Sequence, residues 1–250
     1  MKIHRMKNPV FRFLTERLGK FLLYFFKLTV RIFSPGPAFY PPEKFEFTRD
    51  FEKNRELIRD EFLQAEQAGK ISRIQDVFKE QGKLSVDDTW KSGFLLLYGF
   101  EFEKFSNSCP VTASLIKKYP QISSAMFSVL APGKKLVAHR GPYAGVLRYH
   151  LGLIIPDQNK CSITVKDEKQ YWQEGKSLIL DDTFLHFATN DSTQARVVLF
   201  IDFIKPLPFP LNRLNQFLFL RIANSPFIQD VLVQTRLREK ESFRRLDLKF

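Results

Sequence analysis

Eight short hydrophobic runs between residues 125 and 204 constrain the fold of this 250-residue chain more than any other feature. The runs are either apolar throughout or alternate with a period of two, and both patterns are typical of short β-strands. Pairs such as Pro-Gly, Gly-Pro and Asp-Asp mark turns between them. The runs are 125–130, 135–139, 146–155, 162–166, 170–172, 177–180, 184–188 and 195–204. About eight strands at this spacing predict a β-sandwich or a jelly roll.

The segments on either side of this β region have different patterns. Residues 35–47 form a proline-rich connector, and residues 49–80 carry apolar side chains at helical spacing with a break at Gly69. Residues 109–119 indicate one more helix, with Pro110 in its first turn. We therefore predict an amphipathic segment at 1–34, a helical supporting region at 35–120, the β core at 121–204 and a helical extension at 205–250.

The distribution of charge limits the class of partner. The formal net charge is +12, a value that raises the question of nucleic-acid binding. Residues 1–34 hold eight basic side chains against one acidic, residues 204–250 hold nine against four, and the middle of the chain holds 22 of each. A nucleic-acid site would need basic residues interleaved with stacking aromatics on the central scaffold. We therefore predict no nucleic-acid partner.

The basic ends of the chain are also hydrophobic. In residues 11–33 the longest uncharged run has six residues, whereas a membrane-spanning helix needs about 20. On a helical projection the basic side chains occupy one side, and another side holds Leu14, Leu18, Phe21, Phe25, Leu28 and Ile32. This pattern predicts a helix lying at an anionic membrane surface, and the alternative is a helix packed on its own domain. Residues 211–233 repeat the combination of aromatic and basic side chains.

Three of the four histidines of the chain fall in the β region, and two arginines accompany them. His139 ends one run, His150 lies in the next, and His186 lies late in the region. A single histidine in a strand is more often a hydrogen-bonded core residue than a metal ligand, so spacing alone leaves both interpretations open. Arg148 lies two residues before His150, so both side chains point to the same face. Arg196 begins an apolar run, where an inward-pointing charge needs an anion.

Two interpretations of these arginines remain at this stage. They either lie on the rim of the β domain, paired with Asp181, Asp182 or Asp202, or they point into its interior and bind an anion. Interior arginines beside candidate metal ligands favour a site for a small dicarboxylate next to a metal ion.

Five motifs in a fixed order make the chain similar to a known family. They are HRGP at 139–142, LRYHLGL at 147–153, WQEG at 172–175, DDTFLH at 181–186 and RVVLFID at 196–202. Together they resemble the aspartyl/asparaginyl β-hydroxylase family of Fe(II)/2-oxoglutarate dioxygenases, over about residues 121–204 and more weakly upstream from about residue 56. The run HRGPYAGVLRYHLGL is most similar to the bacterial branch that hydroxylates lipid A acyl chains. The resemblance implies a mainly β fold with flanking helices around a double-stranded β-helix, or jelly roll.

The resemblance also implies roles for individual residues. His139 and His186 match the two histidines that bind the iron. Arg196 matches the arginine that anchors the distal carboxylate of 2-oxoglutarate, and Ser128 matches the serine that assists it. Arg148 and His150 match the pair that contacts the other carboxylate end of the cosubstrate. On this basis His150 is a cosubstrate-binding residue and not a third metal ligand.

One position departs from the commonest pattern of such enzymes. Most of them carry a carboxylate two residues after the first histidine, and this chain has Gly141 there. The aspartyl hydroxylases of the family tolerate this glycine, with water in the vacated position, so the resemblance still implies activity. The iron would then lose one anionic ligand and depend more on the cosubstrate. The remaining motif residues, Trp172, Gly175, Asp181 and Asp182, are assigned turn and packing roles.

The resemblance implies an enzyme that uses Fe(II), 2-oxoglutarate and O2 to hydroxylate an unactivated C–H bond, releasing succinate and CO2. The basic, aromatic ends lead us to expect an acyl chain of a lipid A-like membrane lipid as substrate and an anionic membrane surface as partner. The expected location is the cytoplasmic face of the bacterial inner membrane, with peripheral attachment. The alternatives are a peptidyl aspartyl/asparaginyl hydroxylase and a non-catalytic, membrane-associated β-barrel module.

Overall fold

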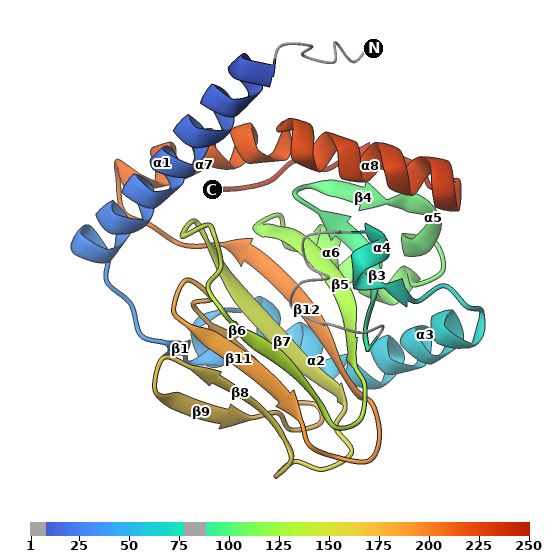
Figure 1. The fold of residues 1–250 in the computed structure, drawn as a ribbon. Coiled ribbons are helices and arrows are strands. Elements are labelled where there is room, and N and C mark those ends of the chain that lie inside the picture. The colour runs from blue at the N-terminus through green and yellow to red at the C-terminus, as the bar shows by residue number, and fades with distance from the viewer. Residues whose placement is uncertain (1–8, 78–88) are drawn as a thin grey trace.

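The computed structural model of the chain describes residues 9–77 and 89–250, with side chains for all of these except residues 9–16 and 239. Two antiparallel β-sheets face each other, and helices surround them (Figure 1). The core strands are β5 (Ile122–Leu130), β6 (Lys134–His139), β7 (Val146–Ile154), β8 (Cys161–Val165), β9 (Glu168–Tyr171), β10 (Ser177–Leu180), β11 (His186–Asn190) and β12 (Arg196–Ile204). Each overlaps one of the eight runs predicted from the sequence, although β5 begins three residues before its run and β11 begins two residues after the start of its run.

The order of these strands defines the fold. The larger sheet contains the order β10-β7-β12-β5, and the smaller sheet has the order β6-β11-β8-β9. Eight strands divided in this way between two facing antiparallel sheets form a double-stranded β-helix, or jelly roll. The predicted fold class, mainly β with flanking helices, is confirmed.

The larger sheet extends beyond the predicted core. The added strands are β1 (Phe39–Tyr40), β2 (Ser72–Arg73), β3 (Trp90–Leu97), β4 (Phe100–Phe102) and β13 (Phe243–Arg245). Strand β3 pairs with β5, β4 follows it, and β13 of the C-terminal segment pairs with β4. The prediction of a helical region over 35–120 is therefore wrong at residues 90–102, and that of a helical extension over 205–250 is wrong at β13. Strand β3 ends in a continuous apolar run, which periodicity alone does not distinguish from a buried helix.

Helices surround the two sheets, and several of them pack against the larger one. They are α1 (Pro9–Phe33), η1 (Pro42–Lys44), α2 (Phe47–Lys53), α3 (Arg55–Gln67), α4 (Ile74–Val77), α5 (Glu103–Ser106), α6 (Pro110–Lys118), α7 (Leu211–Ala223) and α8 (Pro226–Glu239). The predicted break at Gly69 follows the end of α3, but residues 72–73 are a strand, and 78–80 lie outside the described residues. Tyr149 of β7 packs edge-on against Phe47 of α2, and Phe127 of β5 contacts Phe62 of α3.

This packing determines which residues point into the jelly roll. Because successive side chains of a strand point to opposite faces, the outward position of Tyr149 turns Arg148 and His150 toward the smaller sheet. The register of β7 and β12 places Phe200 opposite His150. Arg196 lies four residues before Phe200 on β12, an even number, so it shares this inward face. The arginines and the histidine that the sequence singles out therefore point inward.

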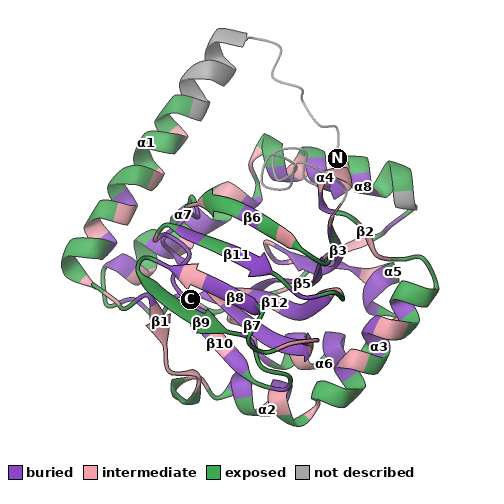
Figure 2. Cartoon of the chain, turned by 60° about the horizontal axis from the view of Figure 1, so that its bottom comes forward, coloured by how far each residue is buried: buried purple, intermediate pink, exposed green. Residues whose placement is uncertain are grey.

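Helix α1 packs on its own domain through a narrow stripe. Phe26 and Val30 are buried in a cluster with Tyr143 and with Phe219 of α7. The apolar face predicted from the sequence lies elsewhere on the helix and is exposed, by 44% to 63% of the side chains, at Leu18, Phe21, Phe25, Leu28 and Ile32. Figure 2 shows α1 reaching away from the sheets with exposed residues along much of its length. The helix therefore contacts the domain and still presents a free apolar face.

No helix among the residues that the structure describes combines the length and the apolarity needed to cross a bilayer.

Candidate active site

His139 and His186 lie side by side on neighbouring strands of the smaller sheet. Strands β6 and β11 pair with His186 directly opposite His139, and the two ring centroids are 4.2 Å apart. Between this pair and the next, in which Ala188 lies opposite Leu136, the register shifts by one residue. Such a β-bulge re-aims the side chains next to it, and here it brings both imidazoles to one side.

The ring nitrogens of both histidines are oriented alike. Nδ1 of His139 lies 2.8 Å from the carbonyl oxygen of Val137, and Nδ1 of His186 lies 3.0 Å from that of Phe184. A carbonyl oxygen only accepts hydrogen bonds, so each Nδ1 carries the proton and each Nε2 keeps its lone pair. Backbone hydrogen bonds of this kind orient metal-binding histidines in proteins. Among the described residues no third His, Cys, Asp or Glu joins them in a metal-binding group.

The environment keeps these imidazoles neutral. Burial lowers the pKa of His186 to about 3 and lowers the pKa of His139 below its ordinary value. Burial, with Arg148 and Arg196 nearby, also lowers the pKa of His150 well below its ordinary value. A neutral imidazole is the form that binds a metal ion, so no proton competes for the pair at neutral pH.

We expect acid to destabilise the metal-free protein through these histidines. A histidine whose pKa is lowered by folding binds its proton more readily when unfolded, so its contribution to stability is present above the unfolded pKa of about 6.5 and is lost as the pH falls toward the folded value. For His186 the loss between pH 7 and pH 5 is about 2 kcal/mol. Urea unfolding at both pH values measures it. The His186→Asn variant should lose about 2 kcal/mol less than the wild type, and an equal loss would contradict this account.

The larger sheet carries three buried polar groups without a hydrogen-bond partner among the described residues. They are Nε2 of His150, Nε of Arg196 and Oγ of Ser92. Ser92 lies opposite Ser128, and Ser128 lies opposite Val198, two residues from Arg196, so all share the inward face. Each buried group of this kind costs about 1–3 kcal/mol, and native proteins contain few of them. Three on one face indicate a place where a polar ligand completes the hydrogen bonding.

Trp172 positions two of these groups. Its Nε1–H donates to Nδ1 of His150 at 3.3 Å, so the proton of His150 is on Nε2, which is the unpartnered nitrogen. The guanidinium carbon of Arg196 lies 4.6 Å from the centre of the Trp172 ring, in a cation–π contact. We assigned Trp172 only a packing role from the sequence. The structure gives it contacts with both residues, which lie 22 and 24 positions away along the chain.

Arg148 and Arg196 differ in their pairing. The Nε of Arg148 donates to Oδ1 of Asp202 at 2.9 Å, and its Nη2 lies 2.9 Å from Oδ2 of Asp182. Burial disfavours the charge of Arg148, but these two carboxylates outweigh it and raise the pKa. Arg196 has no carboxylate partner among the described residues, and burial lowers its pKa to about 10. Of the two interpretations from the sequence, pairing with aspartates is therefore correct for Arg148. Its predicted contact with the cosubstrate would have to compete with two carboxylates. Arg196 has no such competitor and is free to bind an anion.

Asp182 fills the space beside Gly141. A Cβ atom added at Gly141 would overlap the carboxylate of Asp182, and the Gly141 N–H donates to the Asp182 carbonyl at 2.7 Å. Burial raises the pKa of Asp182 to about 6, against the opposing effect of Arg148. The carboxylate of Asp182, from the loop before β11, therefore lies beside Gly141, and Asp182 has more than the packing role we assigned to it.

Ser128 and Ser92 occupy neighbouring strands near Arg196. Oγ of Ser128 accepts a hydrogen bond from Nε1 of Trp90 at 3.0 Å, and Ser128 is diagonal to Arg196 across the β5–β12 pair. The sequence analysis missed Ser92 because it placed this segment in the helical region. No periodic signal marks Ser92, because its run WKSGFLLL does not alternate apolar and polar residues.

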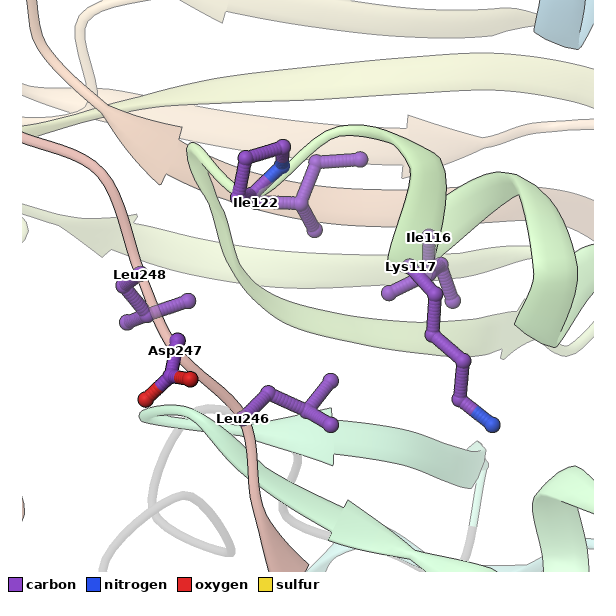
Figure 3. A pocket seen from close by; sticks show the side chains of 7 residues that line it. Ile116, Lys117, Ile122, Leu246, Asp247 and Leu248 are labelled. Atoms are coloured by element: carbon purple, nitrogen blue, oxygen red, sulfur yellow. The ribbon is translucent and has the colours of Figure 1, made fainter.

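Two cavities lie at different ends of the described structure. One, of about 510 Å³, adjoins the histidine pair, and its wall includes Arg140 and Leu185, the neighbours of His139 and His186 in the chain. The other, of about 120 Å³, lies between α6 and the C-terminal segment 246–248 and is lined by Ile116 and Ile122 among others (Figure 3). None of the predicted site residues lines either cavity, but the larger one is lined by residues next in the chain to His139 and His186.

Fold and site together define a class of protein. It is a jelly roll with two neutral histidines, whose Nε2 lone pairs are free, on one sheet and with unpartnered hydrogen-bond donors on the facing sheet. Residues 52–206 match the family model described as aspartyl/asparaginyl beta-hydroxylase. The match covers more than half of the chain, and the chain belongs to this family of hydroxylases.

Individual relatives agree with this assignment. The ornithine lipid ester-linked acyl 2-hydroxylase of Rhizobium tropici is 40% identical over 210 residues, which are 83% of this chain and 75% of that protein. The human aspartyl/asparaginyl beta-hydroxylase is 31% identical over 174 residues, 67% of this chain but 22% of that protein. Among solved structures, the cupin domain of an XRE-family transcriptional regulator from Enterobacter cloacae covers 35% of this chain and 85% of that one, at 14% identity and a TM-score of 0.29. A TM-score of this size carries no inference.

Proposed function

We propose that the chain is an Fe(II)/2-oxoglutarate-dependent dioxygenase that hydroxylates an unactivated C–H bond in the acyl chain of a membrane lipid. The observation that carries this proposal is the pairing of His139 and His186, with both Nε2 lone pairs free, within a jelly roll whose facing sheet holds unpartnered donors on His150 and Arg196. Imidazole suits a ferrous ion, and a guanidinium with a second N–H donor suits a dicarboxylate. The residues present therefore fit both groups.

In this proposal His139 and His186 hold the iron through Nε2, while Arg196 and His150 hold the carboxylates of the cosubstrate. When bound, iron, 2-oxoglutarate and O2 together supply the oxidant that converts C–H to C–OH, with succinate and CO2 as the other products. The protein then needs no general base for the substrate. Its side chains bind and orient the reactants and exclude water. The fully buried Trp172 orients His150 and Arg196 through its contacts with both.

The charges of the site suit a dianionic cosubstrate. Two neutral imidazoles leave the iron with its full double charge. Asp182 and Asp202 already balance Arg148, which leaves Arg196 as the buried cation without a counterion among the described residues. 2-Oxoglutarate carries two negative charges, one for the iron and one for Arg196.

Three observations support a membrane lipid as the substrate. The R. tropici relative, which matches over most of this chain, is named for an acyl 2-hydroxylase of a lipid. Helices α1 and α7 expose Phe21, Phe25 and Phe217 to solvent. Arg31 at the end of α1 donates to the carbonyl of Thr183 at 3.4 Å, in the loop before His186, so α1 lies beside the site. We propose peripheral attachment to an anionic membrane, on its cytoplasmic face, and a lipid A-like substrate.

Mass spectrometry of extracted lipids tests this function. Lipids from a strain lacking the gene and from the same strain complemented with it should differ by the mass of one oxygen atom on an acyl chain. Complementation with the His186→Ala variant is the matched control and should not restore that oxygen. Identical lipids in all strains would contradict the proposal. A hydroxylated aspartyl or asparaginyl peptide, formed on incubation with the purified protein, would instead support the activity for which the human relative is named.

A further inference from the structure

The cavity beside the histidine pair has a basic wall built from separate parts of the chain. Arg31 comes from the end of α1, Arg140 follows His139, and Lys166 comes from the turn between β8 and β9. Asp167 is the one acidic residue that lines it. Within the described part of the chain, none of the three cations forms an ion pair with a carboxylate, whereas Arg73 and Lys118 on other surfaces do. The wall thus has an excess of positive charge that the fold does not neutralise.

The cations of the wall converge and are not scattered. The Phe184 ring lies 5.4 Å from the guanidinium carbon of Arg31 and 5.9 Å from Nζ of Lys166, so two cations contact one ring. Lys27 of α1 is close enough that, after burial, Arg31 and Arg140 are the largest causes of its lowered pKa. Gathering like charges costs free energy in the absence of an anion. The arrangement is therefore typical of a surface made to receive a negatively charged group.

Lys166 adds an independent observation. It is the first residue of a two-residue hairpin turn and has a backbone φ of +59°, where glycine is favoured. A bulky residue in this conformation is uncommon and strained. From this turn its Nζ reaches the ring of Phe184, which also lines the cavity.

We propose that this basic wall binds a phosphomonoester headgroup of an amphiphilic substrate while the attached acyl chain reaches the histidine pair. The inference rests on the proposed function and adds the class of headgroup to it. A phosphomonoester is close to dianionic at neutral pH and offers three acceptor oxygens, which suits the three cations. A zwitterionic headgroup would find Asp167 alone for its ammonium group. The exposed side chain of Leu185 lines the cavity beside the cations and offers apolar contact to the part of the acyl chain next to the headgroup.

Vesicle binding by the full-length, metal-free protein tests the inference separately from catalysis. The probes are phosphatidylcholine vesicles containing phosphatidic acid, a phosphomonoester, or phosphatidylglycerol, a phosphodiester, at matched surface charge and physiological ionic strength. The triple variant Arg31→Ala/Arg140→Ala/Lys166→Ala should bind the phosphatidic acid vesicles about 100-fold more weakly than the wild type, from roughly fivefold per cation. The matched control Lys44→Ala/Lys53→Ala/Lys70→Ala removes the same charge from exposed sites away from the cavity. It should weaken binding far less.

Each result decides the inference. Selective loss of phosphatidic acid binding in the cavity variant, with both variants unfolding like the wild type, supports it. Equal losses in the two variants, or no preference of the wild type for phosphatidic acid over phosphatidylglycerol, would overturn it. Inorganic phosphate that binds as tightly as the lipid would identify a site for free anions and would also overturn the headgroup assignment. Selective binding without any hydroxylation of lipid would contradict the proposed function alone.

Discussion

Replacing Arg196 with methionine is expected to weaken 2-oxoglutarate binding by about 100-fold or more while making the cosubstrate-free protein more stable. Arg196 is 2% exposed and has no carboxylate partner among the described residues. Loss of a buried charge pair with a ligand costs about 2–5 kcal/mol, which gives the weaker binding. Without the ligand the buried charge of Arg196 destabilises the folded protein. The lowering of the Arg196 pKa to about 10 corresponds to a destabilisation of at most about 3 kcal/mol. Calorimetric titration and urea unfolding measure the two effects.

Arg148→Met is the matched control for that experiment. Arg148 lies on the same inward face, but its removal would leave Asp182 and Asp202 buried without their counterion. Breaking a buried ion pair from one side costs about 3–5 kcal/mol, so this variant should be strongly destabilised. A stabilising Arg148→Met together with a destabilising Arg196→Met would show that the two arginines have been given the wrong roles.

Gly141→Asp, which introduces the carboxylate found in most related dioxygenases, is expected to reduce hydroxylation more than about 100-fold. The new side chain would overlap the carboxylate of Asp182 and separate it from Arg148. Overpacking costs about 1–3 kcal/mol, and the broken ion pair adds about 3–5 kcal/mol at the edge of the site. Ferrous ion affinity, urea unfolding and product formation report the effect.

The double variant Gly141→Asp/Asp182→Gly separates steric overlap from chemistry. It removes the overlapping carboxylate, so folding and iron binding should recover relative to Gly141→Asp alone. A Gly141→Asp protein that is as stable as the wild type and binds iron more tightly would contradict the packing that we describe around Asp182.

The sequence predicts the core strands well because each is a short apolar or alternating run between turn residues. The signal fails at Trp90–Leu97, where a continuous apolar run satisfies a strand and a helix equally. Periodicity also does not predict that the side chains of His139 and His186 lie next to each other. Strict alternation from the inward Leu136 would place His139, three residues later, on the outer face. The bulge between β6 and β11 reverses this, and no turn residue in the sequence marks it.

The roles of the polar residues depend on contacts that the sequence does not encode locally. Arg148 and Arg196 are equivalent in the sequence, as basic residues in apolar runs. They differ because Asp202 lies directly opposite Arg148 on the neighbouring strand, whereas Leu130 lies opposite Arg196. The same reasoning applies to helix α1, whose periodicity predicts an apolar face but not that a separate stripe, with Phe26 and Val30, packs on the domain.

Anaerobic titration of the purified protein with Fe(II) and 2-oxoglutarate tests the central claim most directly. The account predicts a visible metal-to-ligand charge-transfer band in the wild type, no band in a folded His186→Ala variant, and a band that needs much more 2-oxoglutarate in Arg196→Met. A folded wild-type protein that develops no band when both iron and 2-oxoglutarate are in excess would contradict it.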